Sequence, residues 1–140
     1  MVVFFKTKCN IDREADCRVS QSVYSVDCLN CHDDPQVTRP SVYYGTSGRQ
    51  LHIRQLEHLN DVRLMRRSNA LFKHSINEHP TEQPNFVSKP IQSGFKYNLD
   101  RFIFESIKIQ HGNLDNNINC LNSRAEWGHR GLPRLQINHD

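Results

Sequence analysis

The sequence predicts an α+β fold, a small antiparallel β-sheet flanked by helices. Two segments in the first third of the chain alternate apolar and polar residues as β-strands do, and from Gln50 onward the apolar residues recur at helical spacing. The chain is 140 residues long and 36% hydrophobic, with a mean hydropathy of −0.69. This length suits one domain, and this composition is lean for a globular protein without reaching that of a disordered one.

The first strands form a predicted antiparallel hairpin that follows a short extended start within residues 1–18. Gln21–Cys28 alternates in a β-like pattern, and Ser41–Tyr44 is the second strand, which ends at the glycine-containing segment 45–48. Residues 30–40 are rich in Asp, Pro and Thr, so we expect them to connect the two strands as a polar loop.

Two helices follow the hairpin. Ser68 is the expected N-cap of the second of them, Asn69–Glu78, which Pro80 stops. The first has an apolar stripe that consists of Leu51, Ile53, Leu56, Leu59, Val62 and Met65.

The remainder of the chain supplies one more strand and one more helix. A short strand is expected at Asn85–Ser88, between prolines, and Asp100 is the expected N-cap of a third helix. From Gly112 the chain is rich in Asn and is expected to form a loop, with Trp127 as a docking residue. The predicted order is therefore β-β-α-α-β-α followed by a loop.

Charge and apolar runs limit the class of protein. Lys and Arg number 18 and Asp and Glu 15, so the net charge is +3, which permits nucleic-acid binding without requiring it. The longest apolar run near the start is Val2–Phe5. It is too short for a membrane span or a signal-peptide core, so a transmembrane protein is excluded and a secreted one is disfavoured.

Five cysteines and eight histidines stand out, and the odd number of cysteines indicates reduced thiols, some of which hold a metal. Cys28 and Cys31 form a C-x₂-C pair, and His74 and His79 form an H-x₄-H pair. Both spacings are used for tetrahedral zinc, although the gap between the pairs is longer than in a zinc finger. Thiolates with imidazoles select Zn²⁺ over Mg²⁺, so we predict a structural zinc that ties the hairpin to the second helix.

Alternatives to this ligand set remain open. His58 or His32 can replace one of the two histidines, and the paired cysteines can instead be ordinary small apolar residues, with the histidines exposed to solvent. The other cysteines are expected to be plain thiols, although Cys9 and Cys17 can form a second, weaker site, and Cys120 stands alone.

Two tyrosine motifs, an arginine, a glutamate and an asparagine follow one another along the chain. They are Ser22-Val-Tyr24 on the first strand, Tyr43-Tyr-Gly45 on the second, Arg54 on the first helix, Glu105 on the last helix and Asn122 near the end. This order resembles the core of the GIY-YIG nucleases, and the resemblance implies a GIY-YIG-like sheet flanked by helices and a DNA endonuclease activity.

Further pieces resemble the endonuclease domain of Penelope-like retroelements, a subgroup of that family in which two hairpin cysteines and two later histidines also occur. The pieces are Val23-Tyr24, Cys28-Leu-Asn-Cys31, Tyr43-Tyr-Gly-Thr-Ser-Gly-Arg49, Arg54, Glu57-His58, Ser68-Asn-Ala-Leu-Phe-Lys-His74 and Arg101-Phe-Ile-Phe-Glu105. The resemblance covers roughly Val2 to Gly128, so residues 1–128 are expected to form the nuclease-like domain and residues 129–140 a C-terminal tail.

Three features depart from the family pattern. Ser22 stands where the family name has Gly, and Tyr44 occupies the middle of the second motif. The connection between the two tyrosine motifs is also longer than the compact hairpin usual in the family, so we expect His32–Pro40 to bulge out without shifting the register of the strands.

The resemblance implies a role for each site residue. Tyr24 is the general base, Tyr43 hydrogen-bonds phosphate or water, and Arg54 binds the phosphate with its charged fork. Glu105 holds one catalytic Mg²⁺, or Mn²⁺, since carboxylate oxygen is the ligand that these ions prefer. Phosphodiester hydrolysis needs these functions: a polarised water, neutralised phosphate charge and a route for protons.

Two more residues are candidates for the catalytic site. Asn122 positions the glutamate or a phosphate through its amide, and His58 lies one turn after Arg54 on the same helix face. Taken singly, each site residue has an ordinary structural alternative, a packed strand tyrosine or a solvated helix side chain. The joint order of the residues favours the nuclease.

Basic side chains on the first two helices are expected to bind the DNA backbone, although each of them alone can equally be a solvated surface group. They are Arg49, Arg54, Arg63, Arg66, Arg67 and Lys73, with Lys6 and Lys8 nearby in sequence. The expected partners are DNA, in the nucleus, and a reverse transcriptase domain or larger assembly, in cis or in trans. Two rival functions keep the same fold: a nucleic-acid-binding module with an inactive site, and a structural subunit.

Overall fold

The computed structural model describes residues 4–7 and 18–122 of the chain. Cys9, Cys17, Trp127 and the expected domain boundary after residue 128 lie outside the described residues. No helix within the two described ranges is both long and apolar enough to cross a membrane.

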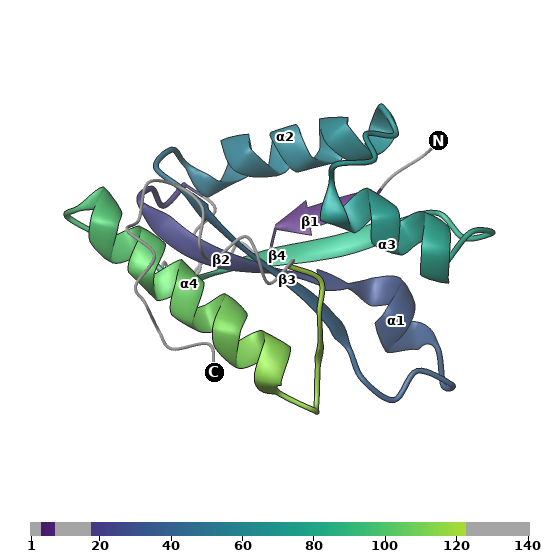
Figure 1. Cartoon of the computed structure of the whole chain (residues 1–140). Coiled ribbons are helices and arrows are strands. Elements are labelled where there is room, and N and C mark those ends of the chain that lie inside the picture. Colours follow the sequence, from purple (N-terminus) through teal and green to yellow (C-terminus); the bar gives the residue numbers. More distant parts are fainter. Residues whose placement is uncertain (1–3, 8–17, 123–140) are drawn as a thin grey trace.

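Nine elements follow one another along the described chain (Figure 1). In order they are β1 (Phe4–Thr7), β2 (Ser22–Cys28), α1 (Leu29–Asp33), β3 (Ser41–Ser47), α2 (Leu51–Arg63), α3 (Ala70–Glu78), β4 (Asn85–Gln92), α4 (Asn98–Leu114) and β5 (Asn119–Cys120). The predicted α+β class is confirmed.

The strands form one mixed sheet in the order β1-β4-β2-β3-β5. The central strands β4, β2 and β3 are antiparallel, as predicted, but β1 pairs with β4 and β5 pairs with β3 in parallel. The expectation of a purely antiparallel sheet is therefore wrong at both edges. Parallel neighbours come from distant segments of the chain, so no hairpin pattern in the sequence marks them.

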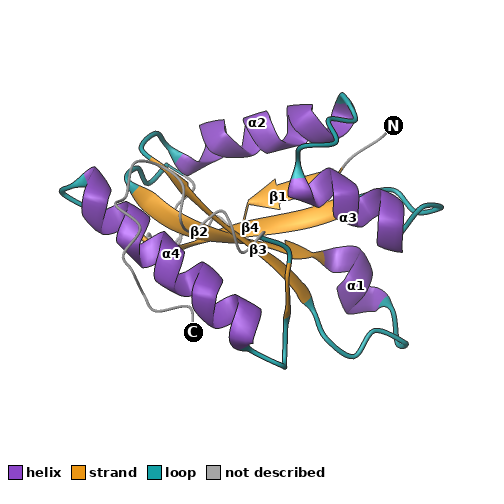
Figure 2. Ribbon diagram, in the orientation of Figure 1, coloured by secondary structure: helices purple, strands orange, loops and turns teal. Residues whose placement is uncertain are grey.

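Helices cover both faces of this sheet (Figures 1 and 2). On one face, Tyr24 and Val26 of β2 pack with apolar residues of α2 and α3, such as Leu51 and Leu71. The alternate residues of β2 and β3 point to the other face, which α4 covers: the guanidinium of Arg101 donates to Thr46 there. Each side of the sheet therefore has its own layer of packed side chains.

The hairpin keeps its register despite its long connection, as expected. Tyr24 pairs with Gly45 and Val26 with Tyr43, and no shift interrupts the pairing of β2 with β3. Part of the connection forms the short helix α1, which the sequence analysis missed. Because both tyrosines fall on alternate positions of adjacent strands, they share the face beneath α2.

Several element ends differ from the prediction. The N-cap of α3 is Asn69 and not Ser68, since the Asn69 side chain accepts hydrogen bonds from the N–H groups of Leu71 and Phe72. The helix α4 starts at Asn98 and continues through Gly112, where a side chain would meet the Tyr44 ring. β3 and β4 are both longer than expected, and β5 was missed.

Candidate functional site

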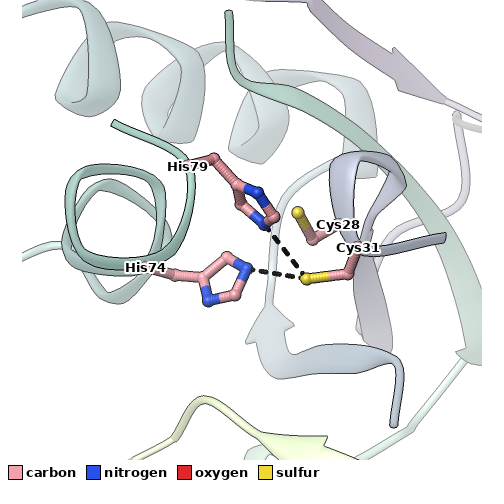
Figure 3. Close-up of side chains that lie close together, drawn as sticks. All are labelled: Cys28, Cys31, His74 and His79. Atoms are coloured by element: carbon pink, nitrogen blue, oxygen red, sulfur yellow. Dashed lines mark hydrogen bonds between the residues drawn. The ribbon is translucent and has the colours of Figure 1, made fainter. Parts of the chain in front are cut away.

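Cys28, Cys31, His74 and His79 come together in the interior of the protein (Figure 3). Their four possible ligand atoms all lie within 4.8 Å of one another, and all four residues are buried. The Sγ atom of Cys31 is 3.2 Å from Nε2 of His74 and 3.1 Å from Nε2 of His79. The predicted pairing of the two spaced motifs is confirmed, and this cluster could hold a metal such as zinc.

Local structure explains how each pair is presented. Cys28 ends β2 and Cys31 lies within α1, so the turn of strand into helix points both thiols to one place. His74 lies in α3 and His79 is its C-cap, with its ring centroid 5.1 Å from that of His74. The cluster therefore joins the end of β2 to the end of α3, two segments far apart in the sequence.

The chemistry of these side chains fits a soft divalent metal. Tetrahedral zinc separates neighbouring S and N ligand atoms by about 3.4 to 3.8 Å. The two Sγ–Nε2 contacts of Cys31 would therefore expand slightly on zinc binding, and the widest separations, which reach up to 4.8 Å, would contract. Burial raises the pKa of the Cys28 thiol to about 12, and burial together with the charge of His79 lowers the pKa of His74. Without a metal the thiol is protonated and His74 is neutral, and a bound cation would favour the thiolate.

Neighbouring residues support the ligands. Oε1 of Glu82 lies 3.5 Å from Nδ1 of His79, the kind of carboxylate contact that orients a ligating imidazole. Asn30, inside the C-x₂-C pair, donates to Glu82 and to the carbonyl of Gln83, each at 3.0 Å, and accepts from the N–H of Asn85 at 2.9 Å. No local pattern in the sequence marks this role of Asn30, because its partners lie more than fifty residues away.

The structure decides between the histidines that the sequence left open. His58 is bonded to Tyr24 and His32 is exposed, so neither belongs to the metal cluster. None of the described cysteines forms a disulfide, and Cys120 is only partly buried, beside Asn122.

A second cluster lies beneath α2. The hydroxyl of Tyr24 is 2.7 Å from Nε2 of His58, and the rings of Tyr24 and Tyr43 both meet the His58 ring edge to face, with centroids 5.9 and 5.5 Å away. Arg54, one turn earlier on α2, lies close enough for its charge to lower the pKa of Tyr24. Four of the six predicted catalytic residues therefore lie together: Tyr24, Tyr43, Arg54 and His58.

Burial dominates the electrostatics of this cluster. It raises the pKa of Tyr24 above the ordinary tyrosine value, although the charge of Arg54 opposes this shift. Burial and the charge of Arg54 lower the pKa of His58 to about 3, so its imidazole is neutral at physiological pH. Tyr24 and His58 are buried, whereas Tyr43 and the Arg54 side chain, 27% exposed, form the solvent side.

Glu105 does not join this cluster on the face beneath α2. It lies on the buried side of α4, which covers the opposite face of the sheet, and it is 1% exposed. Its charge nevertheless contributes to the raised pKa of Tyr24, so the two groups interact electrostatically. The sheet lies between them, with Tyr24 on the face beneath α2 and Glu105 on the face that α4 covers.

Asn122 uses its amide to hold β3. Its Oδ1 accepts from the N–H of Tyr44 and its Nδ2 donates to the carbonyl of Tyr44, both at 2.8 Å. These two bonds fix the backbone next to Tyr43. A role of Asn122 toward Glu105 or a phosphate stays a prediction.

The predicted DNA-binding side chains are exposed on α2, on α3 and in the turns beside α2. Arg49 is paired with Glu57, which also lies 3.5 Å from Arg54, and Arg66 is paired with Asp61 at 3.0 Å. Such exposed pairs are weak and can open toward a phosphate. The exposed residues are Arg49, Arg63, Arg66, Arg67 and Lys73.

Gly45 is the residue that makes room for the Tyr24 ring. A Cβ at this position would overlap Cζ and Oη of Tyr24. We expect Gly45→Ala to lower the free energy of unfolding by about 1–3 kcal/mol, because the buried ring must move away from His58. Urea denaturation measures this. Gly48→Ala is the control, since its Cβ would have 3.4 Å to the nearest atom, and equal stability of the two variants would contradict the packing described.

Comparisons with models of known protein families, with curated proteins and with solved structures find no match for this chain.

Proposed function

We propose that this chain is a DNA endonuclease of the GIY-YIG type, of the kind found in Penelope-like retroelements, which nicks DNA with the help of a divalent metal ion. The observation that carries the proposal is the convergence of Tyr24, Tyr43, Arg54 and His58 from three separate elements onto one place. Tyr24 and Tyr43 also pack in the core beneath α2, but the guanidinium of Arg54 and the imidazole of His58 beside them add polar groups that phosphodiester hydrolysis can use.

The arrangement of the elements supports the same proposal. The central strands β3, β2 and β4 are antiparallel, two helices lie between β3 and β4, and α4 follows β4. This is the small helix-flanked sheet that the resemblance implies, with short strands β1 and β5 added at the edges. Gly45, the glycine of the second tyrosine motif, lies directly opposite Tyr24, the tyrosine of the first.

The solvent side of the cluster suits a phosphate. Arg54 presents a charged fork and Tyr43 a hydroxyl at the partly exposed surface, and both can donate to phosphate oxygens. Tyr24 lies behind them with its hydroxyl on His58. For Tyr24 to take a proton from the attacking water, these two outer side chains must part as the phosphate enters.

The proposed site for Mg²⁺ is at Glu105. A single buried carboxylate suits this ion, which is commonly held by one or two carboxylates together with substrate phosphates. The ion would supply charge neutralisation to the phosphate and to the leaving oxygen. A phosphate at the edge of β3 would meet the tyrosines from one face of the sheet and Glu105 from the other.

The proposed zinc is structural and separate from the catalytic ion. Held by Cys28, Cys31, His74 and His79, it would fasten β2 and α1 to α3 and would take no part in hydrolysis. A structural metal is useful in a chain with so lean a core. The basic side chains around α2 would bind the DNA backbone on either side of the scissile phosphate.

The second candidate is a nucleic-acid-binding module without turnover. The observation that favours it is burial: Tyr24 is 0% exposed and Glu105 is 1% exposed, so neither reaches solvent in this conformation. Both candidates use the same basic surface, and they differ only in whether a bond is broken.

Incubation of supercoiled plasmid with the purified protein distinguishes the two. The proposed function predicts open-circular product with Mg²⁺ or Mn²⁺, no product with a chelator, and little product from the variant Arg54→Ala. If the wild-type protein retards DNA in a gel and never nicks it under any of these conditions, the binding module is the correct function.

A further inference from the structure

Asn69 connects the helix α3 to the tyrosine cluster. It is buried, with an exposed fraction of 9%, and it caps α3 with its side-chain oxygen. Oδ1 accepts from the N–H of Leu71 at 2.9 Å and from the N–H of Phe72 at 3.1 Å. Since two donors point at one end of the amide, that end is the oxygen, and the orientation of the amide is fixed.

The other end of the amide faces His58. Nδ2 of Asn69 lies 3.4 Å from Nδ1 of His58 and 3.4 Å from Oδ2 of Asp61, so each of its two hydrogens has an acceptor. An amide NH₂ can only donate, so this contact is a hydrogen bond when Nδ1 of His58 carries no proton. Because the imidazole is neutral, its single proton is on Nε2, which faces Tyr24 at 2.7 Å.

We infer that Asn69 is a positioning residue that holds His58 in the Nε2–H tautomer, so that His58 donates a hydrogen bond to the Tyr24 oxygen. Three side chains from three elements thus form a chain of two hydrogen bonds. Asn69 donates to His58, and His58 donates to Tyr24. The sequence placed His58 near the site but gave Asn69 no role beyond the start of a helix.

The catalytic meaning of this tautomer rests on the proposed function. In this state His58 cannot take the proton of Tyr24, because Nε2 already carries one. His58 instead donates to the Tyr24 oxygen, and the nearby charge of Arg54 adds to the stabilisation of that oxygen as it becomes negative. Before Tyr24 can take a proton from the attacking water, its own hydroxyl proton must pass to a solvent water on the side where Tyr43 and Arg54 lie, because neither His58 nor the guanidinium of Arg54 can accept it.

Two substitutions of Asn69 keep its function as the cap of α3 and change its contact with His58. Asn69→Asp keeps an acceptor for the two backbone N–H groups but replaces Nδ2 by a second acceptor, which requires a proton on Nδ1 of His58. Asn69→Ser also caps the helix, and its hydroxyl is too short to reach the imidazole, so both tautomers become available to His58.

Long-range ¹H–¹⁵N spectra of protein labelled at histidine nitrogen report which nitrogen carries the proton, with His58→Gln used for assignment. We expect a protonated Nε2 and a bare Nδ1 in the wild type, a protonated Nδ1 in Asn69→Asp, and a mixture in Asn69→Ser. A wild-type protein with the proton on Nδ1 would overturn the inference. So would an unchanged nitrogen pattern in either variant.

Nicking gives the second measurement. If the proposed function is correct, Asn69→Asp lowers the nicking rate about 10- to 100-fold with DNA affinity unchanged, as for other residues that orient a site residue. A wild-type protein that never nicks DNA but shows the expected nitrogen pattern contradicts the proposed function and supports the tautomer. An active Asn69→Asp variant with an inverted tautomer would contradict the role given to His58.

Discussion

The Glu105→Gln variant is expected to nick DNA at least about 10³-fold more slowly than the wild type, with DNA affinity within about twofold. The substitution removes the one negative charge proposed to hold Mg²⁺ and keeps the size and shape of the side chain. Because Glu105 is 1% exposed, a neutral amide is no harder to bury than a carboxylate, and we expect the fold to remain.

Rates of plasmid nicking at saturating Mg²⁺ test this expectation, with binding measured on a short duplex. The matched control is Glu78→Gln, an exposed glutamate on α3 outside the tyrosine cluster, which should nick at the wild-type rate. If Glu105→Gln nicks as fast as this control, Glu105 does not hold the catalytic ion, and the metal site must be sought elsewhere.

Loss of the metal cluster is expected to have the largest effect on stability. Cys31→Ser removes the thiol that contacts both histidines, and we expect the bound zinc to be lost and the free energy of unfolding to fall by about 3–5 kcal/mol. The reason is that the metal would join β2 and α1 to α3 and so add to the links made by the hydrogen bonds of Asn30 and by the shared core.

Metal analysis and urea denaturation measure the two parts of this prediction. Cys120→Ser is the control, because Cys120 forms no disulfide and lies outside the metal cluster, and we expect the variant to keep one equivalent of zinc and to change stability by less than about 1 kcal/mol. The prediction of a structural metal would be contradicted if the wild type held less than about half an equivalent of zinc and the two variants were equally stable.

The metal cluster and the tyrosine cluster are joined by one helix. The helix α3 begins at Asn69, which contacts His58, and it ends at His79, which belongs to the metal cluster. If zinc fixes the end of α3, it also fixes the position of Asn69. We therefore expect Cys31→Ser to weaken nicking as well as stability, although the zinc lies away from Tyr24.

Local signals in the sequence predicted the metal cluster well. The C-x₂-C and H-x₄-H spacings each describe residues that one turn brings together, so both pairs could be found without a structure. The choice of histidines could not be made from spacing, because His58 lies between the pairs in sequence and has a different partner. Only the packing of α2 on Tyr24 excludes it.

The tyrosines show the same limit. The sequence placed Tyr24 and Tyr43 on two neighbouring strands, and the observed register brings them to one face of the sheet. The face covered by α4 was not predictable, since the path of a helix over a sheet depends on long-range packing. Glu105 was therefore expected beside the tyrosines and is found across the sheet, buried under α4.

The strand β5 and the N-cap of α3 were not predicted correctly, and each has a physical reason. The strand β5 has two residues and pairs with the start of β3, which precedes it by more than seventy positions, so no local pattern marks it. Ser68 and Asn69 are both good N-cap residues, and only the observed hydrogen bonds to Leu71 and Phe72 select Asn69. With Asn69 and not Ser68 as the N-cap of α3, the contact between the Asn69 side chain and His58 becomes visible.

The most direct test of the proposed nuclease is an analysis of the ends it makes. A labelled DNA duplex is incubated with the wild-type protein and Mg²⁺, and a polymerase then extends any new end. The proposed function predicts a single-strand nick that leaves a 3′ hydroxyl the polymerase can extend, and none when a chelator is present or when Glu105 is replaced by Gln. DNA that is bound but stays intact in the presence of Mg²⁺ and of Mn²⁺ would contradict the account.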